Sequence, residues 1–291
     1  RPRSDDRAHP GRPGDRPRPS QAEGRADAPR RPRSGPPELK VCGVNACLTV
    51  ARRRPADIRR IYIAEPMIPQ FRAVLKAASQ ARVAYHVVDD EELGRVTGSV
   101  HHEGICMLVR ERPAARLDDV LERVRAARAR GEPAVLLYLE RVQNPHNLGA
   151  ILRVCAHFGA MAVLACGDGL RLSSALARTA QGGAEWVELV PVAPGVAPLQ
   201  RARAAGLSLI ATSPRGDHTL LSGAPALPAG AVVMLGSEAD GLSEALLELA
   251  DAVVAIPGTG HLESLNVACA AAVALAEHWR LHGPRGLASD T

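Results

Sequence analysis

The stretch "LERVQNPHNLGAILRVCAHFGA", residues 139–160, joins the end of an apolar run to a helical pattern through a polar turn. Asn144 begins the turn, because a residue before proline is pushed out of the helical region. Asn147 is then placed to cap a helix that runs to about His157. The expected buried stripe of this helix consists of Ile151, Val154 and Phe158.

Arg153 stands on the same predicted helix, with little bulk on the side of the helix beside it. Gly149 and Ala150 lie four and three positions earlier, where side chains would be its neighbours. A glycine early in a helix costs ~1 kcal/mol relative to alanine, which suggests close approach by a ligand or partner. For this stretch taken alone, a capped helix with a surface arginine is the better explanation.

From Pro133 onward, short apolar runs alternate with helical patterns. The strand-like runs are "AVLLYLE", "AVLAC", "VELVPV", "LSLIATS", "AVVMLGSE" and "DAVVAIP". The helical patterns include "GAILRVCAHFG", "LQRARAAG", "SEALLELA" and "SLNVACAAAVALAEHWR". Such alternation predicts an α/β fold with a parallel sheet covered by helices. Ligands bind at the carboxyl ends of strands in open sheets of this kind, so polar residues just after each strand are candidate site residues.

A second polar cluster, "MLGSEADGL", occupies residues 234–242. Gly236 ends a buried strand and would let a ligand approach the backbone. Glu238 follows directly at the carboxyl end of the strand. The simpler interpretation is a loop in which Ser237 or Asp240 caps the next helix.

The third cluster is "AIPGTGHLESLNVACAAAVALAEHW", residues 255–279, where a strand ends and an Ala-rich helix follows a glycine loop. Ser264 is expected to cap that helix. The free N–H groups of a helix N-terminus suit a carboxylate or another electron-rich group. Asn266 inside the first turn is a poor helix former, which indicates a contact beyond the helix.

The rest of the chain divides at changes of composition. Residues 1–37 hold nine prolines and no Ile, Leu, Val, Phe, Tyr, Trp or Met, so we expect a disordered tail. Residues 38–112 alternate strand-like and helix-like runs, which predicts a small α/β domain. Residues 113–132 are charged and favour a helix, as a connector between domains would. The large parallel-sheet domain is expected to span residues 133–283.

The tail carries the surplus charge of the chain. Counted through Lys40, it has eleven Lys/Arg against six Asp/Glu, and this surplus of five equals the formal net charge of the whole chain, +5. The folded part is therefore near neutral. An Arg-rich flexible arm attracts phosphate backbones without reading sequence, whereas a solvated linker would have no such role; the sequence leaves both open.

Length and cysteine usage limit the class of protein. The 291 residues suit two folded units plus a tail. The six cysteines show neither C-x-x-C pairs nor metal-ligand spacing, and no secretory signal pattern precedes them, so reduced thiols in a cytoplasm are expected. The longest apolar run, Val267–Ala276, falls short of the ~18 residues that cross a bilayer. The chain starts at Arg1 rather than Met, as a fragment or trimmed chain would.

The sequence does not match the nucleotide-binding and metal-binding motifs that were considered. "GDGLRL" lacks the last glycine of a dinucleotide fingerprint, and no GxxxxGK[ST] occurs. His101, His102 and His157 have no metal-ligand spacing, so no metal is expected. Ser173, Ser174 and Thr179 are interpreted as helix and turn residues rather than substrate contacts.

The three polar clusters gain meaning from their order and separation. "NPHNLGAILR", "LGSEADGLS" and "IPGTGHLESLNVA" resemble the three signature motifs of the SpoU, or TrmH, family of RNA 2′-O-ribose methyltransferases. The resemblance covers about residues 134–281. The preceding unit looks like the L30e-type substrate-binding domain of that family, with "VCGVNACLTV" and "VTGSVHHEGI" as its recognisable pieces.

The resemblance implies a fold and a function. It implies a catalytic domain with a deep trefoil knot that binds S-adenosylmethionine, works as a homodimer and methylates structured RNA, either rRNA or tRNA. It makes Arg153 the catalytic arginine. The other implied site residues are Asn147, Glu238, Ser264 and Asn266 in catalysis, and Thr212, Gly236, Ile256 and Leu265 in cofactor binding. Gly258 stands where the family usually has Met, which implies a looser loop over the cofactor.

The implied methyl transfer leaves open both the role of Arg153 and two other functions. A ribose 2′-OH is a poor nucleophile until its proton is drawn away, so positioning and deprotonation are the tasks. A guanidinium with a pKa above ~12 is a reluctant base, so Arg153 acts as that base, stabilises the developing alkoxide or works with a substrate phosphate. Two other functions stay open: an RNA-binding protein without turnover, which only Gly258 favours, and a small-molecule transferase, against which the L30e-like unit and the basic tail argue.

Overall fold

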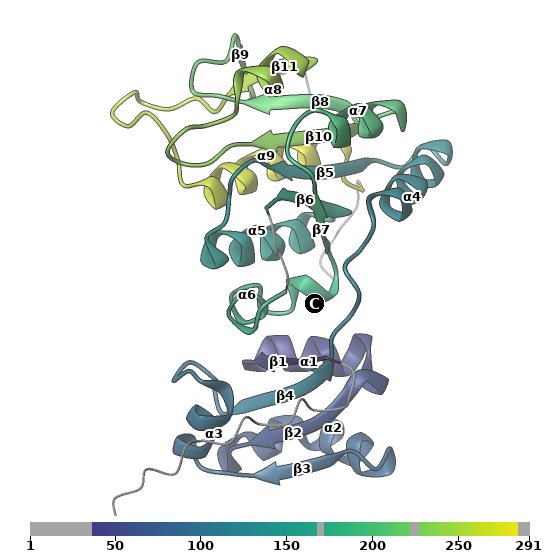
Figure 1. The fold of residues 1–291 in the computed structure, drawn as a ribbon, viewed down its shortest axis with the longest axis vertical. Helices are drawn as coiled ribbons and strands as arrows, with labels where there is room; N and C mark the ends of the chain where they lie inside the picture. Colours follow the sequence, from purple (N-terminus) through teal and green to yellow (C-terminus); the bar gives the residue numbers. More distant parts are fainter. Residues whose placement is uncertain (1–36, 168–171, 222–226, 285–291) are drawn as a thin grey trace, which may run out of the picture. The chain divides into compact units, whose positions relative to one another are not determined.

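A computed structural model describes residues 37–167, 172–221 and 227–284 of the chain (Figure 1). The predicted tail, residues 1–37, lies outside these residues except for Pro37. Part of the "GDGLRL" stretch also lies outside them. Within the described ranges, no helix is long and apolar enough to cross a membrane.

The first domain is a four-stranded sheet in the order β1-β4-β2-β3, in which β2 and β3 are parallel and the other pairs antiparallel. Its main elements are β1 (Glu38–Cys42), α1 (Val44–Arg53), β2 (Ile58–Ile63), α2 (Ile68–Gln80), β3 (Ala84–Val87), α3 (Asp90–Thr97) and β4 (Ile105–Arg110). Short 3₁₀ turns, η1 (Pro55–Asp57) and η2 (Glu65–Met67), flank β2. The small α/β domain is confirmed, but α1 and α3 were missed from the sequence.

Alternation along the strands explains which face of this sheet is covered. Val41, Ile61 and Met107 point to one face and share a core with Phe71 of α2 and Val50 of α1. The tight turn from β1 into α1 is held at Gly43, which has a φ of 97°. There the Val44 N–H donates to Glu103 Oε2 at 2.8 Å, so "VCGVNACLTV" and "VTGSVHHEGI" meet in space.

The predicted connector contains one helix, α4 (Leu117–Ala129). Its apolar face, with Val120 and Val124, packs against Leu136 and Tyr138 of the large sheet. The helix therefore belongs to the core of the second domain.

The second domain is a seven-stranded sheet in the order β7-β6-β5-β10-β8-β11-β9, and every pairing in it is parallel. Figure 1 shows this order from β9 at the top to β7 below. The strands are β5 (Ala134–Leu139), β6 (Ala162–Cys166), β7 (Glu188–Val192), β8 (Ser208–Thr212), β9 (His218–Thr219), β10 (Gly230–Leu235) and β11 (Ala252–Ala255). The predicted α/β class with a parallel sheet is confirmed; only the two-residue β9 was not expected.

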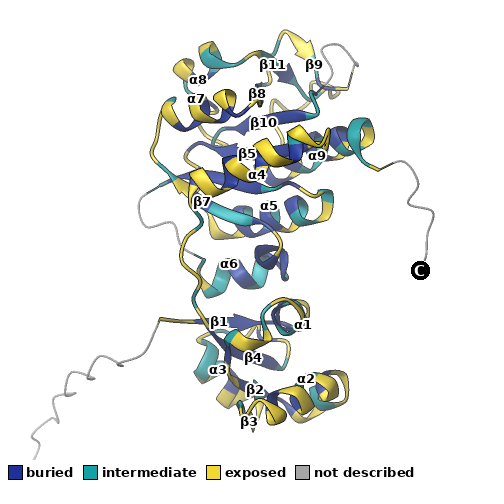
Figure 2. Cartoon of the chain, turned by 90° about the vertical axis from the view of Figure 1, so that its right-hand side faces the viewer, coloured by how far each residue is buried: buried dark blue, intermediate teal, exposed yellow. Residues whose placement is uncertain are grey.

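Helices cover both faces of this sheet (Figure 2). They are α5 (Pro145–Phe158), α6 (Ser174–Thr179), α7 (Ala197–Ala204), α8 (Glu244–Leu249) and α9 (Val267–His282), with a 3₁₀ turn, η3 (Gly183–Glu185), after α6. α5, α6 and α9 share one core, and α4, α7 and α8 share the other. α5 and α9, far apart in sequence, pack side by side. The trefoil knot stays a prediction.

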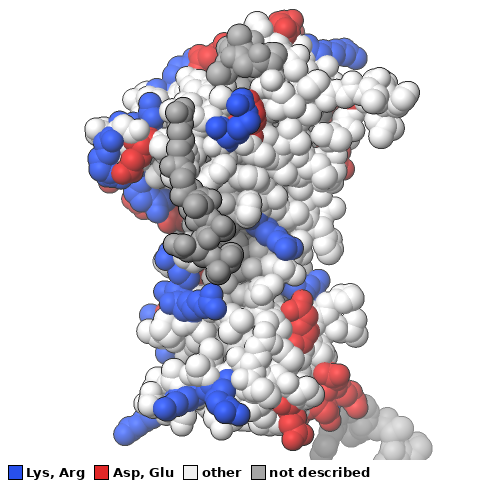
Figure 3. Space-filling model, turned by 180° about the vertical axis from the view of Figure 1, so that it is seen from behind, with Lys and Arg blue, Asp and Glu red and all other residues white. Residues whose placement is uncertain are grey.

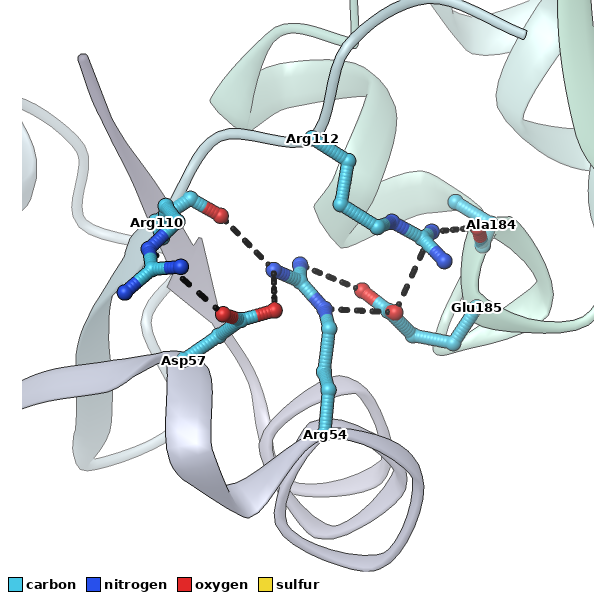
Figure 4. A network of polar contacts seen from close by, with 6 residues as sticks. All are labelled: Arg54, Asp57, Arg110, Arg112, Ala184 and Glu185. Carbon is cyan, nitrogen blue, oxygen red and sulfur yellow. Dashed lines mark hydrogen bonds and ion pairs between the residues drawn. The ribbon is translucent and has the colours of Figure 1, made fainter. Parts of the chain in front are cut away.

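Ion pairs join Arg54, which follows α1, and Arg112, which follows β4, to η3 (Figure 4). The Arg54 guanidinium donates twice to the carboxylate of Glu185, with both bonds at 2.8 Å. Arg112 adds an ion pair to Glu185 at 3.2 Å and donates to the Ala184 carbonyl oxygen. Glu185 is only 6% exposed. Its charge is therefore satisfied almost entirely by side chains that come from the first domain and the stretch after it.

Candidate active site

The strand order brings the three polar clusters together. β5, β10, β8 and β11 are consecutive neighbours in a sheet whose strands all run the same way, so their carboxyl ends share one edge. The first cluster follows β5, the second follows β10, the third follows β11, and Thr212 ends β8. Residues spread over more than a hundred positions of sequence thus meet at one place.

Three of the predicted catalytic residues form a hydrogen-bonded trio at this edge. Asn147 Nδ2 donates to Glu238 Oε1 at 3.1 Å, and Asn266 Nδ2 donates to the same oxygen at 2.7 Å. Asn266 Nδ2 also lies 3.1 Å from Asn147 Oδ1. The backbone N–H of Val267 adds a weaker bond to Glu238 Oε1 at 3.4 Å. The three clusters therefore converge on one carboxylate.

The helix caps differ from those expected. Asn144, not Asn147, is the N-cap of α5, and its side chain accepts from the His146 N–H. Asn266, not Ser264, is the N-cap of α9, and its Oδ1 accepts from the Ala268 N–H at 2.9 Å. The capping signal was placed on the wrong polar residue in both motifs, because several candidates stand within three positions of the helix start.

Position 149 requires a glycine for a different reason from the one expected. A Cβ there would lie 2.5 Å from Thr179 Cβ and 3.1 Å from the backbone N of Ala180. The space beside α5 is filled by the end of α6 of the same chain, so the bare side of the helix is not open to ribose. The expectation that a ligand or partner explains this glycine is wrong.

Gly236 also makes room for the chain itself. A Cβ at this position would lie 2.0 Å from the Gly241 carbonyl carbon, because an isolated bridge between Ser237 and Gly241 folds the loop back on β10. The direct steric reason for this glycine is therefore the loop. Whether Gly236 also contacts a cofactor through its backbone stays a prediction.

Two residues after β5 hold the second cluster in place and were missed from the sequence. Glu140 is buried, and its Oε2 accepts from the Ser243 N–H at 2.7 Å. Arg141 donates to the Gly241 carbonyl oxygen at 3.3 Å and lies 3.7 Å from Asp240. A charged residue at the end of the all-apolar run "AVLLYLE" was the available signal. Ser243, rather than Ser237 or Asp240, is the N-cap of α8.

Arg153 does not join the trio within one chain. Arg153 is six positions from Asn147, and six positions correspond to about 9 Å along a helix and roughly 240° around it. Its exposed side chain lines a hollow beside η3. Among the residues that the structure describes, no hydrogen bond or ion pair involves its guanidinium. Val154 and Phe158, expected in the buried stripe, are only half-buried at this hollow, and the fully buried face holds Ile151, Leu152 and Cys155.

The predicted cofactor residues surround the same strand ends. Thr212 Oγ1 donates to the Met234 carbonyl oxygen at 2.9 Å, between β8 and β10. Ile256 is half-buried against the core, while Leu265 and every other residue from 257 to 266 are exposed. Leu262 is 82% exposed. A Cβ at Gly258 would meet nothing within 4 Å, so its loop is unconstrained there.

These residues fit an adenosine-containing cofactor better than a metal. The loop after β11 offers open backbone groups and two exposed leucines, and an adenine ring needs both polar and apolar contacts. Within the described ranges, no group of three or more His, Cys, Asp or Glu side chains is arranged to hold a metal ion.

Comparison with known proteins gives family matches over both domains. The SpoU rRNA Methylase family model matches residues 134–276, and the model described as RNA 2′-O ribose methyltransferase substrate binding matches residues 40–115. An uncharacterized tRNA/rRNA methyltransferase, YfiF, of Escherichia coli O157:H7 is 37% identical over 243 residues, covering 84% of this chain and 68% of the relative.

A second relative and a solved structure agree with that match. The 23S rRNA (guanosine-2′-O-)-methyltransferase RlmB of Nitrosomonas europaea is 32% identical, with 84% of this chain and 92% of the relative covered. The crystal structure of the SpoU methyltransferase AviRb from Streptomyces viridochromogenes, in complex with AdoMet, shares the fold with a TM-score of 0.67. It is 24% identical and covers 84% of this chain and 90% of its own. The motifs, the parallel sheet and these matches agree, and the chain belongs to the SpoU family of RNA methyltransferases.

Proposed function

We propose that this chain transfers a methyl group from S-adenosylmethionine to a ribose 2′-hydroxyl of rRNA or tRNA. The observation that carries the proposal is the trio of Asn147, Glu238 and Asn266, which joins all three family motifs at one sheet edge. Family membership supports the donor, and the name of the RlmB relative supports the ribose target.

The residues have separate tasks in this proposal. Asn147 and Asn266 hold the Glu238 carboxylate in one orientation at the end of β10. Backbone groups near Gly236, Ile256 and Leu265, together with Thr212, bind the cofactor. The cofactor supplies an electrophilic methyl group. Arg153 places positive charge at the 2′-oxygen as the hydroxyl proton passes to water, and Ser264 lies in the loop that faces the substrate. A guanidinium suits this charge-stabilising task better than that of a base.

A second copy of the chain completes the site in this proposal. Arg153 and the trio occupy different sides of α5, so one chain does not present both to the same 2′-hydroxyl. A two-fold dimer repeats both sets of residues, so that Arg153 of one protomer can face the trio of the other. A homodimer therefore provides two complete sites.

The domains divide the work. We assign residues 38–112 to RNA substrate binding and residues 133–283, together with α4 that packs on their sheet, to methyl transfer. Residues 1–37 add a basic arm. On the face that Figure 3 shows, Lys and Arg side chains are scattered rather than gathered into one large patch.

The reaction is tested with S-adenosylmethionine labelled in its methyl group and with rRNA and tRNA transcripts. A 2′-O-methyl group blocks alkaline cleavage of the adjacent phosphodiester, so label is expected in dinucleotides that resist alkali. Label in single nucleotides would show base methylation, and RNA binding without any label would show a binding protein without turnover. Either outcome rejects the proposal.

The shared site is tested by mixing two inactive variants. Arg153→Ala and Asn266→Ser, carrying different affinity tags, are co-expressed and the mixed dimer is isolated. If Arg153 serves the site of the other protomer, one of the two sites is intact and about half of the normal activity per dimer returns. If Arg153 serves its own chain, both sites are damaged and the mixed dimer stays inactive.

A further inference from the structure

A hollow of about 550 Å³ lies beside Arg153, outside the trio and the predicted cofactor loop. We call it the Trp186 hollow. It is lined by Thr49 of α1, by residues 153–158 of α5 other than Cys155, by residues 180–183, and by Trp186. Its volume falls in the range of sites that bind small molecules. Arg153, a predicted catalytic residue that lies outside the trio, lines this space.

Aromatic side chains gather here although the chain has few. The whole sequence has two tryptophans and two phenylalanines, and one of each lines this hollow. Trp186 is 59% exposed, which is unusual for so large an apolar ring. The His157 ring lies edge-on to Phe158 with centroids 4.7 Å apart. Exposed rings of this kind are surfaces on which unpaired bases stack.

Positive charge surrounds these rings. The Arg53 guanidinium lies over the Trp186 ring, 4.2 Å from its centroid, and Arg153 lines the hollow. No Asp or Glu is found among the lining residues that the structure describes. The nearby carboxylate of Glu185 is buried and already taken by Arg54 and Arg112. The charge that faces the hollow therefore suits a phosphate backbone.

Attachment of the first domain does not explain the exposed tryptophan. Two neighbouring pairs link the C-terminal end of α1 to the end of η3: Arg54 with Glu185, and Arg53 with Trp186. The first pair is buried and doubly hydrogen-bonded, so it holds the contact (Figure 4). The second pair lies at the surface, where an arginine and a tryptophan add little stability. Its exposed surface remains open to a ligand.

We propose that the Trp186 hollow binds an unpaired nucleotide of the RNA substrate, with its base against Trp186 and its phosphate near Arg53 and Arg153. This inference rests on the proposed function, because it identifies how RNA is held beside the catalytic arginine. The nucleotide is single-stranded, since only an unstacked base presents its face to a ring. The hollow thereby favours loops, bulges or ends over regular duplex.

The stacking is tested first without turnover. The full chain with Trp279→Phe keeps Trp186 as its single tryptophan. Its fluorescence is titrated with a 12-nucleotide oligoadenylate and with an abasic ribose-phosphate chain of the same length. We expect quenching by the oligoadenylate and much less by the abasic chain. Equal responses to both, or no response to either, overturn the proposal whether or not the protein methylates RNA.

The second test measures steady-state methylation with Trp186→Ala and the conservative Trp186→Phe. Loss of one stacked base predicts a rise in KM for RNA of ~5-fold to ~150-fold in Trp186→Ala. Trp186→Phe should recover most of the affinity, and the Kd for S-adenosylmethionine should stay the same in both. An unchanged KM in Trp186→Ala overturns the inference while leaving the proposed function intact. If the Trp279→Phe protein shows no base-dependent quenching and Trp186→Ala changes the oligomeric state, the hollow is a protein interface and the inference is wrong.

Discussion

At the scale of single residues, Arg153 provides the clearest separation of chemistry from folding. Its side chain is exposed and its helix is fixed by Leu148, Ile151 and Leu152 on the other side. We expect Arg153→Ala to lower methyl transfer at least ~100-fold without changing the unfolding temperature, and Arg153→Lys to keep part of the rate because the charge remains. Arg125→Ala, also exposed on a helix, is the matched control and should behave as wild type. Wild-type turnover in Arg153→Ala would remove this residue from the reaction.

Two glycines of the site motifs should respond in opposite ways to the same change. Gly236→Ala places a Cβ against the backbone of Gly241 and should destabilise the protein by about 1–3 kcal/mol. Gly258→Ala meets open space and should be neutral or stabilise by up to ~1 kcal/mol. Thermal unfolding of both variants checks this pair. If Gly236→Ala unfolds at the wild-type temperature, the loop is not packed as described.

The same residues show what a sequence can and cannot predict. Asn147, Glu238 and Asn266 were expected in the site because the three motifs resemble those of the SpoU family, and the parallel strands bring these motifs to one edge. The reasons for Gly149 and Gly236 were wrong because the atoms that require them, in Thr179 and Gly241, come from other segments. Local spacing contains no information about which segment fills a space.

At the scale of elements, the start of α9 combines stability and chemistry in Asn266. Its Oδ1 caps the helix while its Nδ2 donates to Glu238. Asn266→Ser keeps a capping oxygen and loses the amide donor, so it should fold normally and transfer methyl groups poorly. Asn266→Ala should lose the cap as well, at a cost of ~1 kcal/mol in unfolding free energy. Urea unfolding and methyl transfer, measured on both variants, separate the two roles; equal stability of the pair would contradict the cap.

The other end of α9 predicts a pH dependence. Burial, with the neighbouring His282, lowers the pKa of His278 to about 4, from a usual value of 6.5. The unfolded chain takes up this proton near pH 6.5 while the folded chain does not, so the contribution to stability is complete above 6.5 and is lost as the pH falls towards 4. The unfolding temperature of wild type should therefore fall more over this interval than that of His278→Phe. Parallel curves would show that His278 does not titrate differently on folding.

Most helices and strands were predictable from the sequence, but the segments against which they pack were not. Strong alternation gave most strands and helices of the second domain, including the long α9. The apolar stretch from Leu39 was not recognised as β1 followed by α1, because only the positive φ of Gly43 divides it. α4 was expected as a connector, but its apolar side chains pack on the large sheet. A helix with many charged residues can still have one apolar face.

At the scale of the whole molecule, the charge distribution predicts how the chain binds RNA. The surplus of positive charge belongs to residues 1–40, and the folded part is near neutral. Deleting residues 1–37 should leave S-adenosylmethionine binding intact and weaken RNA binding. For every phosphate that the shortened chain no longer neutralises, the slope of log affinity against log salt should become shallower by ~0.9 on a duplex and ~0.7 on a single strand. Equal slopes for the full and shortened chains would show that the arm does not touch RNA.

The buried carboxylate of Glu185 also affects how such proteins can be recombined. Its ion-pair partners, Arg54 and Arg112, lie before and after the last strand of the first domain, whereas Glu185 lies in the second domain. A chimaera that grafts a foreign substrate-binding module onto this catalytic half would leave that carboxylate buried without its counter-charges, at a cost of ~3–5 kcal/mol. A chimaera that changes the RNA-binding domain therefore has to keep Arg54, Arg112 and Glu185 together.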